Sequence, residues 1–112
     1  MLNYNGKRFR IMGKFKNSEL SADTIFEYKQ KGSILQCQYS NGKVLAGHLL
    51  GTVNDKGYLS MVYHQVNESG EIKTGSCHST PQILPTGKII LHESWQWTSG
   101  DRSSGESTLE EI

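Results

Sequence analysis

Four histidines are the side chains in this sequence best suited to acid/base chemistry or metal binding. Each falls in a different segment with the alternating pattern of a β-strand: His48, His64, His78 and His92. Histidine titrates close to neutral pH, and its neutral ring is a common metal ligand. A zinc site needs three or four such ligands within about 2.0–2.3 Å of one point. Because we expect the four rings at different levels of a sheet, the sequence predicts no metal site.

The spacing around one predicted hairpin brings two of these histidines together. If the turn at residues 54–57 sets the register, His48 lies opposite Tyr63 or His64. This pair is a candidate for general acid/base work or for contact with a ligand, although ordinary strand histidines would show the same pattern. The other two are placed as follows: His78 opposite Ser94 or Trp95, and His92 opposite Thr80.

A carboxylate and two tryptophans alternate in the segment Glu-Ser-Trp-Gln-Trp-Thr at residues 93–98. Glu93, Trp95 and Trp97 therefore point to one face of a strand. If that face is interior, Glu93 must be paired, for example with Arg10, or have a raised pKa. An aromatic pocket with a few polar groups is typical of small-ligand sites. The candidate lining of this pocket is His48, Tyr63, His64, Glu93, Trp95 and Trp97.

Basic residues gather near the start of the chain, at Lys7, Arg8, Arg10, Lys14 and Lys16. Aromatic residues that could stack on bases are not interleaved with the exposed members, so we interpret them as a solvated face and expect no nucleic acid partner. The acidic residues Glu110 and Glu111 lie on the last predicted strand. Opposite charges on the first and last strands would favour their pairing.

Glycine-containing turns separate the alternating segments. They occur at residues 31–33, 41–43, 54–57, 67–70 and 85–88. Each has the composition of a β-hairpin turn, and Asn41-Gly42 suits a type I′ turn in particular. We predict strands at residues 6–15, 22–30, 33–40, 43–53, 57–67, 70–83, 87–98 and 104–111, with a loop or helical turn near residues 17–22.

The number of strands and their short connections predict the architecture. No window of the sequence has convincing helical spacing, so a parallel sheet is not expected. An open meander would leave two long edges, and closure into a barrel removes them. We therefore predict an all-β fold, an eight-stranded antiparallel up-and-down barrel formed by one domain, 1–112, with room for packed side chains or one small ligand.

Composition limits the classes of function. The 112 residues are 35% hydrophobic and 21% charged, with a net charge of +1, which gives no overall field to attract nucleic acid or an anionic membrane. The sequence has no secretory h-region and no long apolar stretch, so we expect a cytoplasmic protein. We also expect its two cysteines, Cys37 and Cys77, to be reduced and to lie half-buried as small hydrophobic residues. Nucleophile and phosphate-binding motifs are absent, and we expect no cofactor.

Three long motifs resemble a family of short bacterial proteins. They are Asn-Gly-Lys-Arg-Phe-Arg at residues 5–10, Tyr-His-Gln-Val-Asn at 63–67 and Leu-His-Glu-Ser-Trp-Gln-Trp-Thr-Ser-Gly-Asp at 91–101. Members of this family often carry the label N-acetylglutamate synthase, which implies an acetyltransferase. The Arg-Ile-Met-Gly-Lys-Phe and Arg-Ser-Ser-Gly-Glu-Ser segments only begin the pyrophosphate-binding pattern of such enzymes, and neither precedes a predicted helix.

A shorter resemblance concerns the end of the chain. Trp-Gln-Trp-Thr-Ser-Gly at residues 95–100, followed by Ser-Thr-Leu at 107–109, is similar to the last two strands of avidin-like barrels. The resemblance implies the barrel architecture.

Three hypotheses on function stay open at this point. The first is a barrel that holds a small ligand in its interior. The second is a small enzyme that uses Glu93 or a histidine as acid or base, including the acetyltransferase named above. The third is a packed barrel that acts as a protein-interaction module or as the subunit of a homo-oligomer. An interior void beside Trp95 and Trp97 would favour the first hypothesis, and a filled interior the third.

Overall fold

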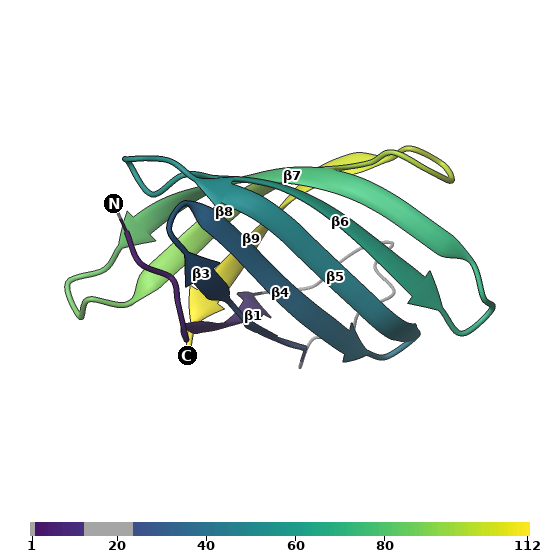
Figure 1. Ribbon diagram of the computed structural model, residues 1–112, viewed down its shortest axis with the longest axis horizontal. Coiled ribbons are helices and arrows are strands. Elements are labelled where there is room, and N and C mark those ends of the chain that lie inside the picture. Colours follow the sequence, from purple (N-terminus) through teal and green to yellow (C-terminus); the bar gives the residue numbers. More distant parts are fainter. Residues whose placement is uncertain (1, 13–23) are drawn as a thin grey trace.

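The protein is an antiparallel β-barrel. The computed structural model describes residues 2–12 and 24–112, and within them it has nine strands (Figure 1). Their bounds are β1 Arg8–Met12, β2 Ile25–Glu27, β3 Lys29–Lys31, β4 Ile34–Asn41, β5 Val44–Val53, β6 Leu59–Asn67, β7 Ile72–Ile83, β8 Ile89–Trp97 and β9 Ser104–Glu111. The predicted all-β meander is thereby confirmed. The predicted loop or helical turn at residues 17–22 lies outside the described residues.

Every strand pairs antiparallel with its neighbours, in the order β2-β1-β9-β8-β7-β6-β5-β4-β3. The strands at the two ends of this order, β2 and β3, are separated in the chain by Tyr28 alone. One short stretch of chain therefore pairs with β1 through its first half and with β4 through its second half. This exchange of partners nearly closes the barrel. It also explains why nine strands are found where eight were predicted, since the segment expected as one strand is divided at Tyr28.

The five predicted hairpin turns are all present, but the turn after β4 differs in detail. Asn41 pairs with Val44, so Gly42 and Lys43 are the central residues. Among them only Gly42 has a positive φ, of 59°. A positive φ at the first central position alone is expected of a type II′ turn rather than the predicted type I′ turn.

The first and last long strands pair as predicted. Arg10 lies opposite Glu110, and their side chains form an ion pair on the outer surface. The suggested interior pairing of Arg10 with Glu93 is therefore wrong, because Arg10 is exposed and engages the outward side chain of β9.

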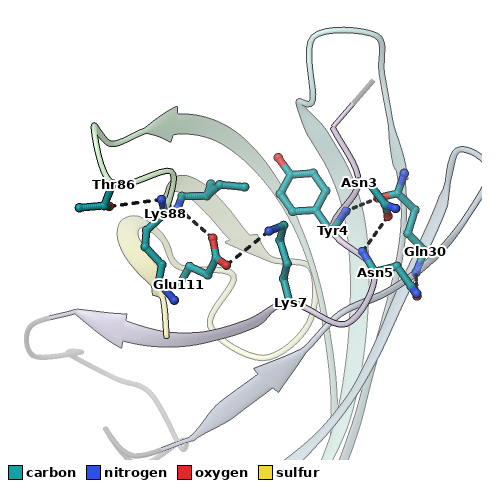
Figure 2. Close-up of polar contacts among 9 residues, drawn as sticks. Asn3, Tyr4, Asn5, Lys7, Gln30, Thr86, Lys88 and Glu111 are labelled. Atoms are coloured by element: carbon teal, nitrogen blue, oxygen red, sulfur yellow. Dashed lines mark hydrogen bonds and ion pairs between the residues drawn. The ribbon is translucent and has the colours of Figure 1, made fainter.

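One end of the barrel, which we call the closed end, carries both described termini and the β5–β6 and β7–β8 hairpins (Figure 1). Tyr4 is fully buried there, and its hydroxyl donates a 2.6 Å hydrogen bond to the Gly57 carbonyl. Its amide donates to Gln30 Oε1 of β3 (Figure 2). The same burial raises the pKa of Tyr4 to about 12. The N-terminal segment thus covers the closed end, where the sequence predicted that a strand would already begin at residue 6.

Glu111, at the end of β9, contacts both β8 and the N-terminal segment at the closed end. Its Oε1 accepts a hydrogen bond from the Ile89 amide, and its Oε2 lies 3.4 Å from Lys7 Nζ (Figure 2). The side chains around these contacts are apolar and fully buried, notably Phe9, Leu59 and Leu91. The tightly packed part of the core therefore lies toward the closed end.

Within the described residues no helix is long and apolar enough to cross a membrane.

Candidate functional site

Four of the six predicted site residues point into the lumen, the space enclosed by the barrel wall. Tyr63 on β6 and Glu93, Trp95 and Trp97 on β8 occupy the same alternate positions as buried core residues of their strands. All four are half-buried, whereas Leu91, two positions before Glu93, is fully buried. The lumen is therefore accessible toward the far end, which carries the β4–β5, β6–β7 and β8–β9 hairpins.

The other two predicted site residues lie on the outside of the barrel. His48 pairs directly with His64, as the predicted register required, and their ring centres are 5.6 Å apart. Both rings point away from the lumen, because His64 follows the inward-facing Tyr63 and successive strand residues point to opposite faces. The expectation that these histidines share an interior pocket with Tyr63 is thus corrected by the alternation of the strand itself.

The remaining histidines are also on the outer surface. His78 pairs with Ser94 and His92 pairs with Thr80, as the register predicted. His92 Nε2 lies 2.8 Å from Gln82 Oε1. The four histidines are spread over the outside of four strands, and the described residues contain no group of three or more His, Cys, Asp or Glu placed to hold a metal.

Three aromatic side chains in the far half of the lumen lie across glycines of the neighbouring strand. The pairs are Tyr39 with Gly47, Tyr63 with Gly75, and Trp95 with Gly105. A Cβ at each glycine would lie 2.3–2.6 Å from the nearest atom of the ring, which is too close for a real contact. The missing side chains allow each ring to lie along the wall, so the rings line the far half of the lumen.

Further contacts hold the aromatic rings in place. Tyr63 and Trp97 meet edge to face, with ring centres 5.2 Å apart. Lys73 Nζ lies 5.7 Å from the centre of the Trp97 ring, a favourable position for a cation. The Tyr39 hydroxyl donates a 3.0 Å hydrogen bond to Gln65 Oε1. Burial raises the pKa of both tyrosine hydroxyls, so they are present as neutral hydrogen-bonding groups.

Glu93 forms the polar centre of the lumen. Ser79 on β7 donates a 2.6 Å hydrogen bond to its Oε2, and the Cys77 thiol lies 3.7 Å from the same oxygen. Burial raises the pKa of Glu93, and the two hydrogen bonds oppose that rise in part. Within the described residues, Ser79 and Cys77 replace the arginine that the sequence suggested as a partner.

The two cysteines are free, as predicted, and they are buried rather than half-buried. Burial raises the pKa of Cys37 to about 12 and also raises that of Cys77, where the Glu93 carboxylate adds to the effect. A buried thiol in an environment that disfavours the thiolate is a poor nucleophile. The cysteines therefore act as packing groups and weak hydrogen-bond donors.

Two buried donors near Glu93 have no hydrogen-bond partner within the described part of the chain. They are the Tyr28 hydroxyl, at the junction of β2 and β3, and Trp95 Nε1. Burial raises the pKa of Tyr28 well above its ordinary value, and the charge of nearby Glu93 contributes to the rise. An unsatisfied buried donor costs about 1–3 kcal/mol, so each of these groups calls for an acceptor, either an ordered water or a ligand.

Several of these residues were missed by the sequence analysis. The inward glycines, Ser79 and Gln65 have no motif of their own, and Tyr28 lay in a segment assigned as an ordinary strand. The register of the hairpins could have identified the inward glycines. Once the hairpin turns are placed, Gly75 falls opposite Tyr63 and Gly105 opposite Trp95. A glycine opposite an aromatic residue on an inward face indicates a ring lying on the wall.

The comparisons with known proteins agree with this architecture. A search of curated proteins finds no match. A protein-family model described as "Avidin-like protein" matches residues 2–112, which is nearly the whole chain. The antiparallel barrel and the full-length match together show that the chain belongs to the avidin-like protein family.

Proposed function

We propose that the protein binds one small organic ligand in its lumen, between the aromatic rings of the far half and Tyr28, whose ring packs on Tyr4 and Phe9 nearer the closed end. The observation that carries this proposal is the combination of an aromatic wall with two buried donors, Tyr28 Oη and Trp95 Nε1, that lack partners in the described chain. Membership of the avidin-like family is compatible with such a role. The half-buried state of the aromatic residues supports this hypothesis over the packed interaction module, which required a filled interior.

The lining defines the chemistry of the ligand. Rings that lie along the wall offer flat apolar surfaces, so the ligand has a flat or compact apolar part that stacks on Trp95, Trp97 or Tyr63. The two unpaired donors call for hydrogen-bond acceptors on the ligand, such as carbonyl or ether oxygens. Glu93 adds a polar group to the lining: its carboxyl accepts a hydrogen bond from Ser79, and burial raises its pKa. A largely uncharged ring compound with two or more acceptor atoms satisfies all of these groups.

The test is a thermal-shift screen of metabolites followed by tryptophan fluorescence. A ligand that binds only the folded protein raises its melting temperature, because 100 Kd of free ligand adds about 2.7 kcal/mol of stability. Both tryptophans of the chain, Trp95 and Trp97, belong to the proposed site, so binding also changes the intrinsic emission. We expect ring compounds with acceptor atoms to shift both signals.

A variant tests whether the ligand binds in the lumen or on another surface of the protein. Trp95→Phe keeps an aromatic ring but removes Nε1, and we expect it to weaken binding by about tenfold, the equivalent of one hydrogen bond. His92→Gln on the outer face is the matched control and should bind as the wild type does. Equal binding by the wild type and Trp95→Phe, or no hit across a broad library, would contradict the proposal.

A further inference from the structure

The outer-face histidine pair is not used by the proposed lumen site, and its geometry is close to that of a metal chelate. His48 and His64 are direct partners on β5 and β6, with ring centres 5.6 Å apart and ring planes inclined by 32°. Two imidazole nitrogens at metal-bonding distance, with an angle of 90–109° at the metal, place the ring centres about 4.5–5.3 Å apart. A small rotation of either side chain covers the difference.

The hydrogen bonding of His48 leaves a nitrogen free for such a bond. Its Nε2 lies 3.4 Å from Gln36 Oε1, on the neighbouring strand β4. When Nε2 donates its proton to this amide oxygen, the lone pair of the ring is on Nδ1. A ring nitrogen held by a carbonyl oxygen while the other binds the metal is the usual arrangement for a ligating histidine.

The surroundings of the pair are open, and the outer face of the four strands around it carries no charged side chain; Lys29, opposite Gln36, lies one strand further away on β3. The pair borders an open depression of about 860 Å³ that is lined by outward residues of β4 to β7, by Ile25 of β2, and at its inner edge by the lumen residues Tyr39 and Gln65. The cross-strand neighbours in the same row are Gln38, opposite His48, and Thr74, opposite His64. The outward residues of these four strands have even numbers, in the ranges 34–40, 46–52, 60–66 and 72–78. None of them is Lys, Arg, Asp or Glu. A cation is therefore not repelled, and solvent can fill its remaining coordination positions.

We propose that His48 and His64 form a two-histidine binding site for a divalent transition metal on the outer face of the barrel. Imidazole ligands suit Cu²⁺, Ni²⁺ and Zn²⁺, whereas Mg²⁺ and Ca²⁺ take oxygen ligands. The site is a pair on one face rather than the four-histidine cage that the sequence made improbable. It is separate from the lumen, because both rings point away from Tyr63 and the residues around it.

The test is a calorimetric titration of the full chain, without an affinity tag, with CuCl₂, NiCl₂ and ZnCl₂ in a buffer that does not bind metals. We expect saturable binding at one metal per chain. His48→Gln and His64→Gln should each weaken it on the order of tenfold or more. His92→Gln is the matched control, since His92 is also an exposed strand histidine beside a glutamine, but without a second histidine opposite. It should bind as the wild type does.

A measurement on the unmodified protein keeps the test independent of the variants. Zn²⁺ should shift the imidazole NMR signals of His48 and His64 and leave those of His78 and His92 in place. The proposal is overturned if no saturable binding occurs, if both glutamine variants bind like the wild type, or if His78 and His92 respond equally. MgCl₂ should produce no heat of binding at the same concentration, and equal binding of Mg²⁺ would also overturn it.

Discussion

Substituting Gly75 by alanine tests whether the aromatic wall depends on glycines. A Cβ at this position would lie 2.4 Å from Tyr63 Cζ and 2.5 Å from its hydroxyl oxygen. Carbon atoms in contact are normally about 3.5–4.0 Å apart. The overlap is therefore more than about 1 Å, and the tyrosine ring has to leave the wall and its edge-to-face contact with Trp97.

The size of the effect follows from two opposing contributions. Overpacking of this kind costs about 1–3 kcal/mol. Replacing glycine by alanine in a strand recovers about 0.5–1 kcal/mol through the unfolded chain. We expect Gly75→Ala to reduce the free energy of unfolding by about 1–2 kcal/mol, or roughly 4–16 °C in melting temperature for a domain of this size. Its tryptophan emission should also change, because Tyr63 contacts Trp97.

Two controls test whether the destabilisation by Gly75→Ala comes from the clash with the Tyr63 ring. In a Tyr63→Leu background the clash is absent, so a double-mutant cycle should give a coupling energy of about 1 kcal/mol or more. Gly51→Ala meets Met61 and the Ser60 carbonyl instead of an aromatic ring, and should destabilise the protein without changing the tryptophan emission. The reasoning is refuted if Gly75→Ala is as stable as the wild type, or if its penalty is the same in the Tyr63→Leu background.

Two further predictions concern buried polar groups. Burial raises the pKa of Glu93, so ionising this carboxyl in the folded protein costs stability. The cost is absent below the ordinary pKa of about 4.3 and grows as pH rises toward the folded-state pKa. Glu93→Gln should therefore gain stability over the wild type as pH rises above about 4.3, and a gap in urea midpoint that does not change with pH would count against this. Tyr4→Phe should lose about 1–2 kcal/mol, because the buried Gly57 carbonyl loses its 2.6 Å hydrogen bond. The exposed Tyr58→Phe is its control in the same urea titration, and equal midpoints for the two variants would show that the bond is not stabilising.

The fold was predictable because local signals agreed with one another. Glycine turns fixed the hairpins, and two-residue alternation fixed the faces of the strands between them. From these the register followed, so that the pairing of His48 with His64 and of His92 with Thr80 is confirmed. Charge on the first and last strands also indicated the closure that the Arg10–Glu110 pair makes.

What the sequence did not predict depends on contacts between distant residues. The division of one predicted strand at Tyr28 arises because its two halves have different partners, β1 and β4, and no local pattern signals that exchange. The role of the N-terminal residues as a cover depends on Tyr4 reaching Gly57, more than fifty residues away.

The tryptophans of the candidate site, Tyr63 and Glu93 were predicted, whereas the polar residues that contact Glu93 were missed. Glu93, Trp95 and Trp97 were found because they alternate within one strand. Ser79 was not, since its meeting with Glu93 requires the register of two strands. The placement of His48 and His64 beside Tyr63 was an error that alternation alone could have prevented, because His64 and Tyr63 are consecutive.

Tyr28 lies where the barrel closes, between β2 and β3, and its hydroxyl also belongs to the proposed ligand site. Its backbone is the point at which the chain passes from one sheet edge to the other, and its hydroxyl is one of the buried donors without a partner in the described chain. A molecule that accepts a hydrogen bond from this hydroxyl would hold the junction between β2 and β3 in place. Ligand binding would then also slow amide exchange along β2 and β3, the two short strands that flank Tyr28.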